Sequence, residues 1–346
     1  MATTTQSLQT TQATPAQPPT PERFFNAINA HVQTEALKAA LDLEVFTAIA
    51  EGSVTAAAIA KRCGTAERGV RTLCDFLTIH GFLTKDRTGY GLAPDTAVFL
   101  NRKSPAYIGG AMEFMLNPHS REAYGRMTEA VRLGGTAMGP GSVVAENPDW
   151  VIFARAMAPL MRMPAQMMAA ELRKGGEAQK VLDIAAGHGI YGITVAKENP
   201  DAQVYAADWK NVLEVAKANA EAMGVADRYH LIPGSAFETD FGSGYDLVLV
   251  PNFLHHFDVP TCTTLLKKVR AALKPGGRVA ILEFMPNDDR VTPPTAAAFS
   301  MTMLVNTPSG DAYTYKEIES MAKNAGFAKV EFAGDVGFSR LAIAYL

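Results

Sequence analysis

Residues 180–208, KVLDIAAGHGIYGITVAKENPDAQVYAAD, decide the fold of this chain. An apolar run over residues 181–185 is interrupted by a glycine-containing turn and followed by a helical pattern that stops before Pro200. A second apolar run, over residues 203–207, ends on Asp208. A strand, a glycine turn, a helix, a second strand and a terminal acidic residue together predict a βαβ unit that binds an adenosine-containing cofactor.

The glycine turn and the acidic strand end each suit a nucleoside ligand. Gly187 and Gly189 let the backbone approach the ligand closely, because a Cβ would occupy that space. Asp208, at the tip of the second strand, is placed to accept hydrogen bonds from two ribose hydroxyls. Residues 187–192 also satisfy the pattern G-x-G-x-x-G, so a dinucleotide is the rival cofactor.

Two further features favour S-adenosylmethionine over a dinucleotide. Asp183 lies inside the first strand, where a buried carboxylate needs a cation or hydrogen-bond donors, and the ammonium of a methionine moiety is such a partner. Downstream, residues 273–281, LKPGGRVAI, join a helix end, a Pro-Gly-Gly turn and a new strand. Together the D-x-x-x-G-x-G loop, the acidic strand tip and the L-x-P-G-G turn resemble the class I S-adenosylmethionine-dependent methyltransferases.

Composition excludes several other classes of protein. The chain has 346 residues, of which 48% are hydrophobic and 19% charged, which suits a globular protein of two domains. Its net charge of −3 gives no electrostatic reason to expect nucleic acid or an anionic membrane as partner. Cys63, Cys74 and Cys262 form neither a disulfide framework nor a metal-ligand set, so we expect no metal and a cytoplasmic location.

Patterning divides the chain into four segments. Residues 1–21 are mostly Thr, Gln, Ala and Pro with almost no charge, and predict a disordered tail. Residues 22–105 predict a mainly α winged helix, with helical spacing from Phe24 to Ile49, two further helices and a short hairpin. Residues 106–175 predict a helical linker that borders a substrate pocket. Residues 176–346 predict the methyltransferase domain.

A winged helix suggests either DNA binding or dimerisation. Residues 1–105 hold ten Lys and Arg against nine Asp and Glu, and the second helix mixes Arg68 and Arg71 with Glu67 and Asp75. A DNA reader needs a basic face for phosphate contacts. We therefore expect a dimerisation domain whose long apolar first helix packs against a second copy of the chain.

The fold class expected for residues 176–346 is an α/β sheet of seven strands. Alternating strands and helices predict a Rossmann-like methyltransferase sheet, and the short connection between the last two strands predicts that the last one is antiparallel. Ligands of such sheets bind at the carboxyl ends of the strands. This edge collects the candidate residues Asp183, Asp208, Ser235, Phe237, Asn252–His256 and Glu283.

Two adjacent histidines at this edge are candidates for catalysis. Methyl transfer from a sulfonium is an in-line displacement, so the protein must orient the acceptor and make it nucleophilic. A phenol titrates near 10, and a histidine close to its hydroxyl can take the proton at neutral pH. His255 and His256 follow the fourth strand, although only one of them can point inward.

From about residue 22 onward the chain resembles the dimeric small-molecule O-methyltransferases of plant phenolic and bacterial polyketide metabolism. The catalytic histidine of that family matches His255, and the acidic residue after its fifth strand matches Glu283. A second acidic residue of the family, in a G-x-E-R-T segment, is replaced by Ala312 in GDAYT, residues 310–314. This departure leaves C-methylation of an aromatic or tetrapyrrole-like carbon as a rival to O-methylation.

The resemblance also implies cofactor and pocket residues. It places Asp183, Gly187 and Gly189 beside the methionine moiety and Asp208 beside the ribose. The adenine would meet Ser235 and Phe237, and Trp209 either covers that ring or packs as a strand-end aromatic. Asn252 completes the expected cofactor set, and the expected acceptor pocket holds Met157, Met161 and His256, although each Met also suits a core.

The sequence thus predicts a homodimeric, cytoplasmic S-adenosylmethionine-dependent methyltransferase. The expected acceptor is a hydroxyl of a small aromatic or polycyclic metabolite, with His255 as general base. A winged-helix regulator that uses the methyltransferase fold to sense a ligand is the alternative from another class. The charge balance of residues 1–105 disfavours it.

Overall fold

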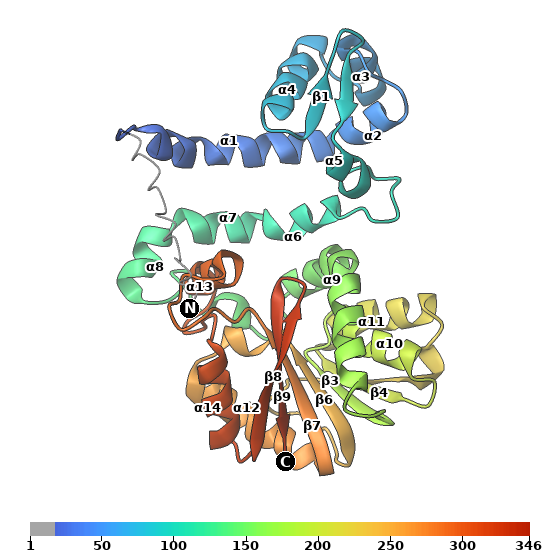
Figure 1. Ribbon diagram of the computed structural model, residues 1–346, viewed down its shortest axis with the longest axis vertical. Coiled ribbons are helices and arrows are strands. Elements are labelled where there is room, and N and C mark those ends of the chain that lie inside the picture. Colours follow the sequence, from blue (N-terminus) through green and yellow to red (C-terminus); the bar gives the residue numbers. More distant parts are fainter. Residues whose placement is uncertain (1–17) are drawn as a thin grey trace, which may run out of the picture. The chain divides into compact units, whose positions relative to one another are not determined.

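The computed structural model describes residues 18–346, so most of the expected tail over residues 1–21 lies outside the described residues. By its internal contacts the chain divides into two compact units, one ending at Pro105 and one spanning Ala106–Leu346. The first unit is mainly helical, and the second contains the large β-sheet (Figure 1).

The first unit is a helical domain with a small hairpin. Its elements in chain order are α1 (Glu22–Asp42), α2 (Val45–Ala50), α3 (Ala56–Cys63), α4 (Glu67–Ile79), β1 (Leu83–Lys85), β2 (Tyr90–Leu92) and α5 (Pro94–Phe99). The Thr55 hydroxyl accepts a hydrogen bond from the Ala58 N–H at 3.2 Å and so caps α3. The helix, helix and hairpin expected of a winged helix are present.

The expected helix from Phe24 to Ile49 is in fact two helices. Glu44 adopts a left-handed conformation with φ of 57°, which turns the chain between α1 and α2. The turn buries Phe46 and Ile49 inside the unit. The apolar spacing continues across the break because α2 and the last turn of α1 face the same core, and this hid the turn from the sequence pattern.

The first half of α1 carries an apolar face that its own unit leaves uncovered. Phe24, Phe25 and Ile28 are each more than half exposed. Aromatic and aliphatic side chains in such a row are typical of a surface that meets a partner.

The second unit begins with helices. These are α6 (Met112–Met115), α7 (Pro118–Gly125), α8 (Met127–Leu133) and α9 (Asp149–Arg173), with short 3-10 turns η1 (Gly109–Ala111) and η2 (Gly141–Val143). The longest, α9, packs on α10 and α11 of the sheet domain.

The rest of the second unit is a seven-stranded sheet with helices on both faces. Its strands are β3 (Lys180–Ile184), β4 (Gln203–Asp208), β5 (Tyr229–Pro233), β6 (Tyr245–Pro251), β7 (Leu273–Glu283), β8 (Lys329–Val336) and β9 (Ser339–Tyr345). Its helices are α10 (Ile190–Glu198), α11 (Lys210–Ala222), α12 (Val259–Ala272), α13 (Pro294–Asn306) and α14 (Tyr315–Asn324), with 3-10 turns η3 (Ala226–Arg228) and η4 (Leu254–His256).

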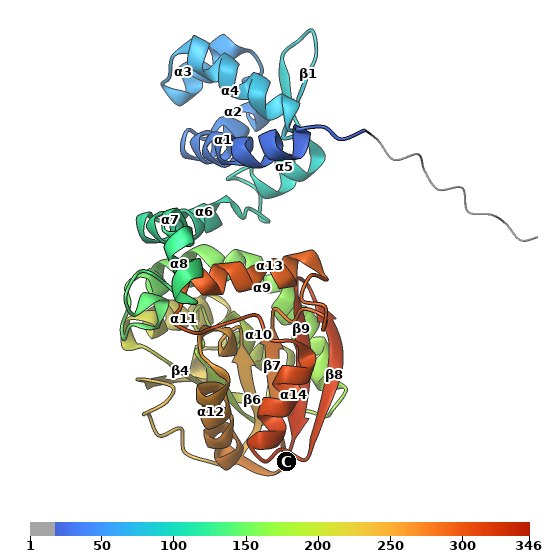
Figure 2. The same ribbon diagram turned by 90° about the vertical axis from the view of Figure 1, so that its left-hand side faces the viewer.

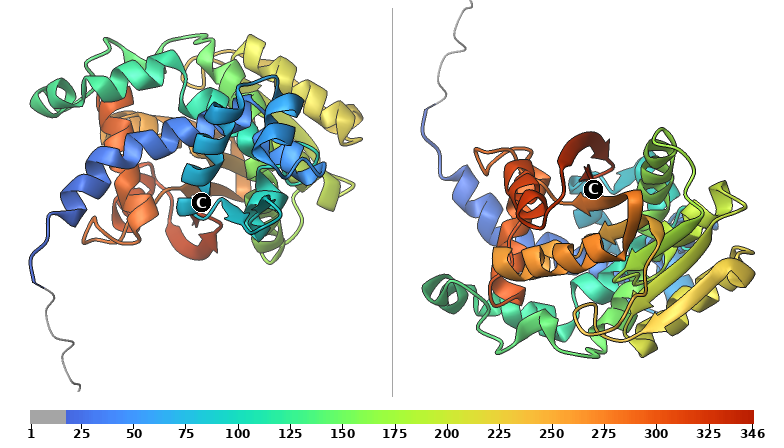
Figure 3. Two further views of the ribbon diagram at one scale, coloured as in Figure 1. Left: turned by 90° about the horizontal axis from the view of Figure 1, so that it is seen from above. Right: turned by 90° about the horizontal axis from the view of Figure 1, so that it is seen from below.

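The strand order is β5-β4-β3-β6-β7-β9-β8, and β9 runs antiparallel to both of its neighbours. This confirms the expected fold class, including the antiparallel last strand. Helices α9, α10 and α11 lie on one face of the sheet, and α12 and α14 lie on the other (Figure 1). Viewed from below, β8 and β9 form one edge of the sheet (Figure 3).

Two details differ from the sequence expectation. The strand expected to start at Arg278 starts at Leu273, which pairs with Tyr245 before residues 274–277 leave the ladder and Arg278 pairs with Leu247. The Pro-Gly-Gly turn is therefore an excursion within β7, and Gly276 takes the positive φ of 77° that it requires. Helix α13, which packs against α7 and α8 (Figure 2), was not expected, because its many Ala, Met and Thr residues show little amphipathic spacing.

Candidate active site

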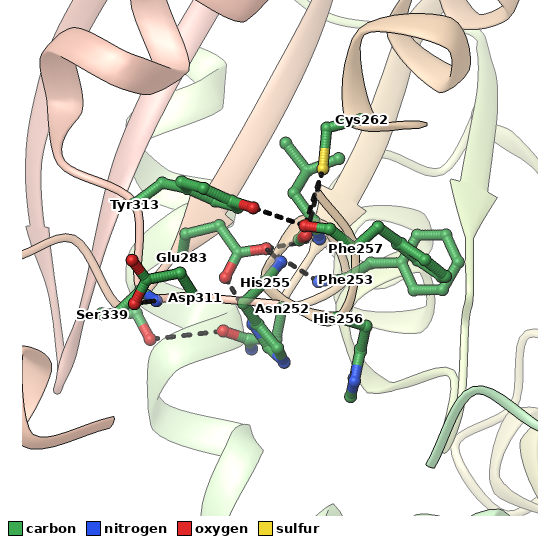
Figure 4. Close-up of polar contacts among 12 residues, drawn as sticks. Asn252, Phe253, His255, His256, Phe257, Cys262, Glu283, Asp311, Tyr313 and Ser339 are labelled. Atoms are coloured by element: carbon green, nitrogen blue, oxygen red, sulfur yellow. Dashed lines mark hydrogen bonds and ion pairs between the residues drawn. The ribbon is translucent and has the colours of Figure 1, made fainter. Parts of the chain in front are cut away.

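The loop after β6 carries the histidines and is fastened to the end of β7. The Nδ1 atom of His255 lies 2.6 Å from Oε2 of Glu283, and both side chains are almost fully buried (Figure 4). The other carboxylate oxygen, Oε1, accepts backbone N–H groups from Phe253 at 2.9 Å, Leu254 at 2.7 Å and His255 at 3.3 Å. One carboxylate thus holds both the backbone and the imidazole of the loop.

This arrangement fixes the tautomer of His255. Oε2 of an ionised carboxylate can only accept, so Nδ1 carries the proton and donates it to Glu283. Nε2 is then the ring nitrogen with a lone pair. A neutral imidazole held in this tautomer is ready to take a proton at Nε2.

The carbonyl groups of the same loop are held by side chains from other elements. The Tyr313 hydroxyl donates to Phe257 O at 2.5 Å, and the Cys262 thiol donates to Leu254 O at 3.1 Å (Figure 4). Gly310 also packs closely against the loop: a Cβ at this position would lie 2.1 Å from His255 O. The loop is therefore fastened through both its N–H and its C=O groups.

The position at which the resemblance implies a second carboxylate holds Ala312, which is completely buried. The neighbouring Asp311 does not replace it. The Asp311 carboxylate pairs instead with Arg290 at 2.9 Å, and Arg290 also reaches Glu317. Of the two acidic groups that the resemblance implies beside the histidine, Glu283 is present and the second is replaced by Ala312.

Aromatic rings surround the histidine pair. The His255 ring lies 4.9 Å from Phe299 of α13, which stacks on Phe284 at 4.0 Å. The His256 ring lies 5.2 Å from Trp150 of α9. Sequence reasoning missed Phe299 and Trp150, since neither lies at a strand end. Only the fold brings their helices to the loop.

A hollow of about 380 Å³ lies between α13, the segment that follows it and the Gly134–Gly135 turn after α8. Its lining includes Met301, Leu304 and Gly310, and Gly310 is also the residue that touches the backbone of His255. This volume lies within the range of pockets that hold small organic ligands.

The glycine loop between β3 and α10 forms the second half of the site. Asp208 Oδ2 accepts the Gly187 N–H at 2.8 Å, and Oδ1 accepts the Trp209 N–H at 2.6 Å. Burial raises the pKa of Asp208 to about 6. The structure thus brings together the expected glycine turn and the expected acidic strand tip. A Cβ on Gly189 would lie 2.6 Å from the Tyr229 hydroxyl, so this position requires glycine.

Asp183 lies beneath the same turn and is wholly buried. Its Oδ2 accepts the Gly192 N–H at 3.1 Å, whereas Oδ1 has no hydrogen-bond partner among residues 18–346. Burial raises the pKa of Asp183 to about 8. An orphaned carboxylate oxygen next to a glycine-lined turn fits a cofactor that brings a cationic group.

His188, between the two glycines, was not among the expected site residues. Its Nδ1 accepts the Ile190 N–H at 3.1 Å, and its ring is stacked against Phe153 of α9 at 6.2 Å. Burial lowers the pKa of His188 to about 4, so the ring is neutral at physiological pH. The sequence feature that could have identified His188 is its place as a polar residue between the two glycines of the motif.

The remaining expected cofactor residues lie at the same edge of the sheet. Ser235 Oγ accepts the Phe237 N–H at 3.2 Å, and the Phe237 ring packs 5.0 Å from Phe257. Asn252 takes a positive φ of 53° and donates to the Tyr191 hydroxyl at 3.3 Å. Trp209 packs with Val212 and other side chains of α9 and α11, as a strand-end aromatic would.

The expected pocket residues divide between core and loop. Met161 is buried and accepts a hydrogen bond from Tyr191 at its sulfur, and Met157 packs at the edge of the same core. His256 lies in the loop, where burial and the neighbouring His255 hold its pKa well below the usual range. The ring of His256 therefore stays neutral.

Comparison with known proteins agrees with this geometry. The O-methyltransferase domain profile matches residues 146–328, and the O-methyltransferase dimerisation domain profile matches residues 25–102. The chain belongs to the O-methyltransferase family. Its cofactor is S-adenosylmethionine, and it is an enzyme that transfers methyl groups.

Individual relatives extend across nearly the whole chain. A crystal structure from Nostoc punctiforme, assigned as an O-methyltransferase, is 50% identical, covers 95% of this chain and 100% of its own, and superposes with a TM-score of 0.92. The 3-hydroxy-5-methyl-1-naphthoate 3-O-methyltransferase of Streptomyces sahachiroi is 28% identical, covering 86% of this chain and 87% of its own length. Human N-acetylserotonin methyltransferase in complex with S-adenosylmethionine, at 21% identity over 96% of this chain and 99% of its own, shares the fold with a TM-score of 0.83.

Residues 18–346 contain neither a membrane-spanning helix nor a cluster of metal ligands. No described helix is long and apolar enough to cross a membrane. No cluster of His, Cys, Asp and Glu in this part of the chain is arranged to hold a metal ion.

Proposed function

We propose that this O-methyltransferase methylates a hydroxyl of a small aromatic or polycyclic metabolite, with His255 as general base and Glu283 as its orienting partner. The observation that carries the proposal is the 2.6 Å contact between His255 Nδ1 and Glu283 Oε2, which leaves the Nε2 lone pair for a substrate proton. The relatives support the acceptor class, because they include methyltransferases named for a hydroxynaphthoate and for acetylserotonin.

S-adenosylmethionine supplies a methyl group on a sulfonium, which is an excellent leaving group. The residues that would hold it are Asp183, Gly187 and Gly189 toward the methionine moiety and Asp208 toward the ribose, with Ser235, Phe237, Asn252 and Trp209 bordering the rest. The orphaned Oδ1 of Asp183 is the contact that an ammonium would complete. Asp208 would exchange its bond to Gly187 for ribose hydroxyls, or accept both together.

The protein's own contribution to the chemistry is orientation and proton transfer. The acceptor oxygen would bond to the methyl carbon of the cofactor, and the electron pair of the carbon–sulfur bond would stay on sulfur. The hydroxyl proton passes to Nε2 of His255, and Glu283 stabilises the imidazolium that forms. The rings of Trp150, Phe299 and His256 would give a planar acceptor aromatic surfaces.

An acceptor panel tests the proposal. The purified protein is incubated with methyl-labelled S-adenosylmethionine and with 3-hydroxy-5-methyl-1-naphthoate, N-acetylserotonin or 3-amino-4-hydroxybenzoate, and products are identified by mass spectrometry. We expect at least one acceptor to gain a label that is stable as an aryl methyl ether. A label on ring carbon instead would replace this function by C-methylation, which the missing carboxylate at Ala312 keeps as the second candidate.

We further propose that the chain forms a homodimer through the unit before Pro105 and works in the cytoplasm. The match to the dimerisation domain and the exposed apolar face of α1 support the dimer, and the three free cysteines support a reducing compartment. Replacing Phe24, Phe25 and Ile28 together by Ser should give monomers in sedimentation. A dimer of unchanged affinity in that variant would overturn this assignment.

A further inference from the structure

The loop that carries His255 is a short and irregular piece of chain. The 3-10 turn η4 holds three residues, and Asn252 before it sits in a left-handed conformation. Such a segment makes few hydrogen bonds of its own, so its position depends on groups from other elements.

Those groups form two sets: one binds the N–H groups of the loop, and the other binds its carbonyl groups. Glu283 of β7 binds three N–H groups at the start of the loop. Tyr313, just before α14, donates to the carbonyl of Phe257 at the end of the loop, and Cys262, on α12, donates to the carbonyl of Leu254 within it. The Cys262 thiol also lies 3.6 Å from Phe257 O.

The two groups that donate to the loop carbonyls, the Tyr313 hydroxyl and the Cys262 thiol, stay protonated. Tyr313 is 5% exposed and Cys262 is fully buried, and both pack in the core between the sheet, α12 and α14. Burial raises the pKa of each group far above physiological pH. Each side chain therefore keeps its proton, and its bond to the loop, across the working range of the enzyme.

Tyr313 also stands beside Ala312, where one of the two carboxylates implied for this site is missing. With Glu283 as the single carboxylate on the histidine, the orientation of the imidazole depends on one contact, between His255 Nδ1 and Glu283 Oε2. We propose that Tyr313 is a positioning residue for His255: its hydroxyl, assisted by the Cys262 thiol, fastens the carbonyl end of the loop so that Glu283 can hold the imidazole. This inference rests on the proposed role of His255 as base.

The experiment uses the Tyr313→Phe variant, which removes one hydroxyl and keeps the buried ring. The matched control is Tyr315→Phe, two residues away, whose hydroxyl donates to Val330 O of β8 at 3.1 Å and does not touch the loop. Hydrogen exchange of the loop amides is measured first, because it needs neither acceptor nor cofactor. We expect exchange at Phe253, Leu254 and His255 to speed up about tenfold in Tyr313→Phe and to stay within twofold in the control.

Turnover then separates positioning from general stability. With the acceptor found in the panel, we expect kcat of Tyr313→Phe to fall about tenfold, because small misplacements of a catalytic group are costly, while KM for the cofactor stays within twofold. In the His255→Ala background the same change should have no further effect, which is the non-additivity expected of a group that acts through another. Cys262→Ala should show a smaller loss that Cys262→Ser, which keeps a donor, restores.

Two results would overturn the inference. Unchanged loop exchange in Tyr313→Phe would mean that the hydroxyl does not hold the loop. An equal loss of kcat with and without His255 would mean that Tyr313 acts elsewhere. If no panel acceptor is turned over, the proposed acceptor class fails, and loop exchange alone decides the role of Tyr313.

Discussion

Two buried carboxylates in one sheet, Glu283 on β7 and Asp183 on β3, are used in opposite ways. Both are completely or almost completely withdrawn from water, with exposures of 1% and 0%. Every oxygen of Glu283 is occupied, by three backbone N–H groups and one imidazole. Asp183 has one bond, from Gly192, and its other oxygen is orphaned within the described chain.

This difference indicates which part of the site is preorganised before ligands bind. A buried carboxylate whose oxygens all accept hydrogen bonds has no unpaired polar atom, and it holds its donors in place. The histidine loop is therefore preformed. Burial without a second hydrogen-bond donor favours the neutral carboxyl, and the pKa of Asp183 is accordingly raised to about 8. This contrast supports the proposal that an incoming cation completes the site at Asp183.

The largest effect should follow from breaking the saturated side with Glu283→Gln. The amide oxygen can still accept the backbone N–H groups, but the amide nitrogen must donate to His255 Nδ1. The imidazole proton then moves to Nε2, where it blocks proton acceptance. We expect kcat to fall by about 10²–10⁴-fold with little change in thermal stability, as measured by initial rates and calorimetric unfolding. A loss below tenfold would show that the tautomer of His255 is unimportant.

Breaking the cofactor side should give the next largest effect. Asp208→Ala removes an acceptor for ribose hydroxyls, a charge-assisted pair worth roughly 1.5–3 kcal/mol, so affinity for S-adenosylhomocysteine should fall about tenfold or more. Isothermal titration calorimetry measures it. Unchanged affinity, or tighter binding of NAD by the variant, would reverse the assignment of Asp208.

Asp183→Asn should separate stability from function. The pKa of Asp183 is raised from 3.8 to about 8 in the folded protein, so the folded state binds more protons between these values. Stability is thereby lost as pH rises toward 8. The variant has no such loss, so its melting temperature should exceed the parent's by an amount that grows from pH 6.5 to pH 8, by roughly 2–4 °C per kcal/mol.

The comparison of variant with parent removes the other shifted groups of the site. Asp208, whose pKa is raised to about 6, and His188, whose pKa is lowered to about 4, are present in both proteins, so the difference between the two melting temperatures reports Asp183. Equal melting temperatures of variant and parent at pH 8 would mean that the orphaned oxygen of Asp183 carries no cost. Cofactor affinity should fall in the same variant, since the ammonium loses its partner.

The smallest effect is expected at Trp209, next to Asp208. Its ring packs with Val212 between α9 and α11, so Trp209→Phe keeps an aromatic side chain in the same cluster. Affinity for S-adenosylhomocysteine should change less than about threefold. A loss of tenfold or more in a titration would instead make Trp209 the cover of the adenine ring.

The parts of the fold read correctly from sequence are those whose signal is local. The glycine turn, Asp208 and the apolar runs of the strands are contiguous patterns, and the sheet follows them. The break at Glu44 was missed because the apolar spacing continues across it, and helix α13 was missed because an Ala-rich helix leaves little periodicity. In the site, His255 and Glu283 could be paired only by resemblance.

Other site features could not be read from the sequence because they depend on tertiary contact. Tyr313 and Cys262 come from two different segments and meet the loop only in the fold. The aromatic contacts of His255 and His256 come from α13 and α9. The number of hydrogen-bond partners of Glu283 and of Asp183 likewise depends on the fold. A sequence pattern does not show that every oxygen of Glu283 accepts a hydrogen bond while one oxygen of Asp183 has no partner.

The most direct test of the central claim is the pH dependence of His255→Ala. If His255 takes the hydroxyl proton, the variant should lose about 10²–10⁴-fold in rate at pH 7. It should then recover part of that loss as pH rises toward 10, where a phenol ionises by itself. Initial rates from pH 6 to pH 10 with the acceptor from the panel give the profile. A loss below about tenfold, with no recovery at high pH, would contradict the general-base account and favour methylation of carbon.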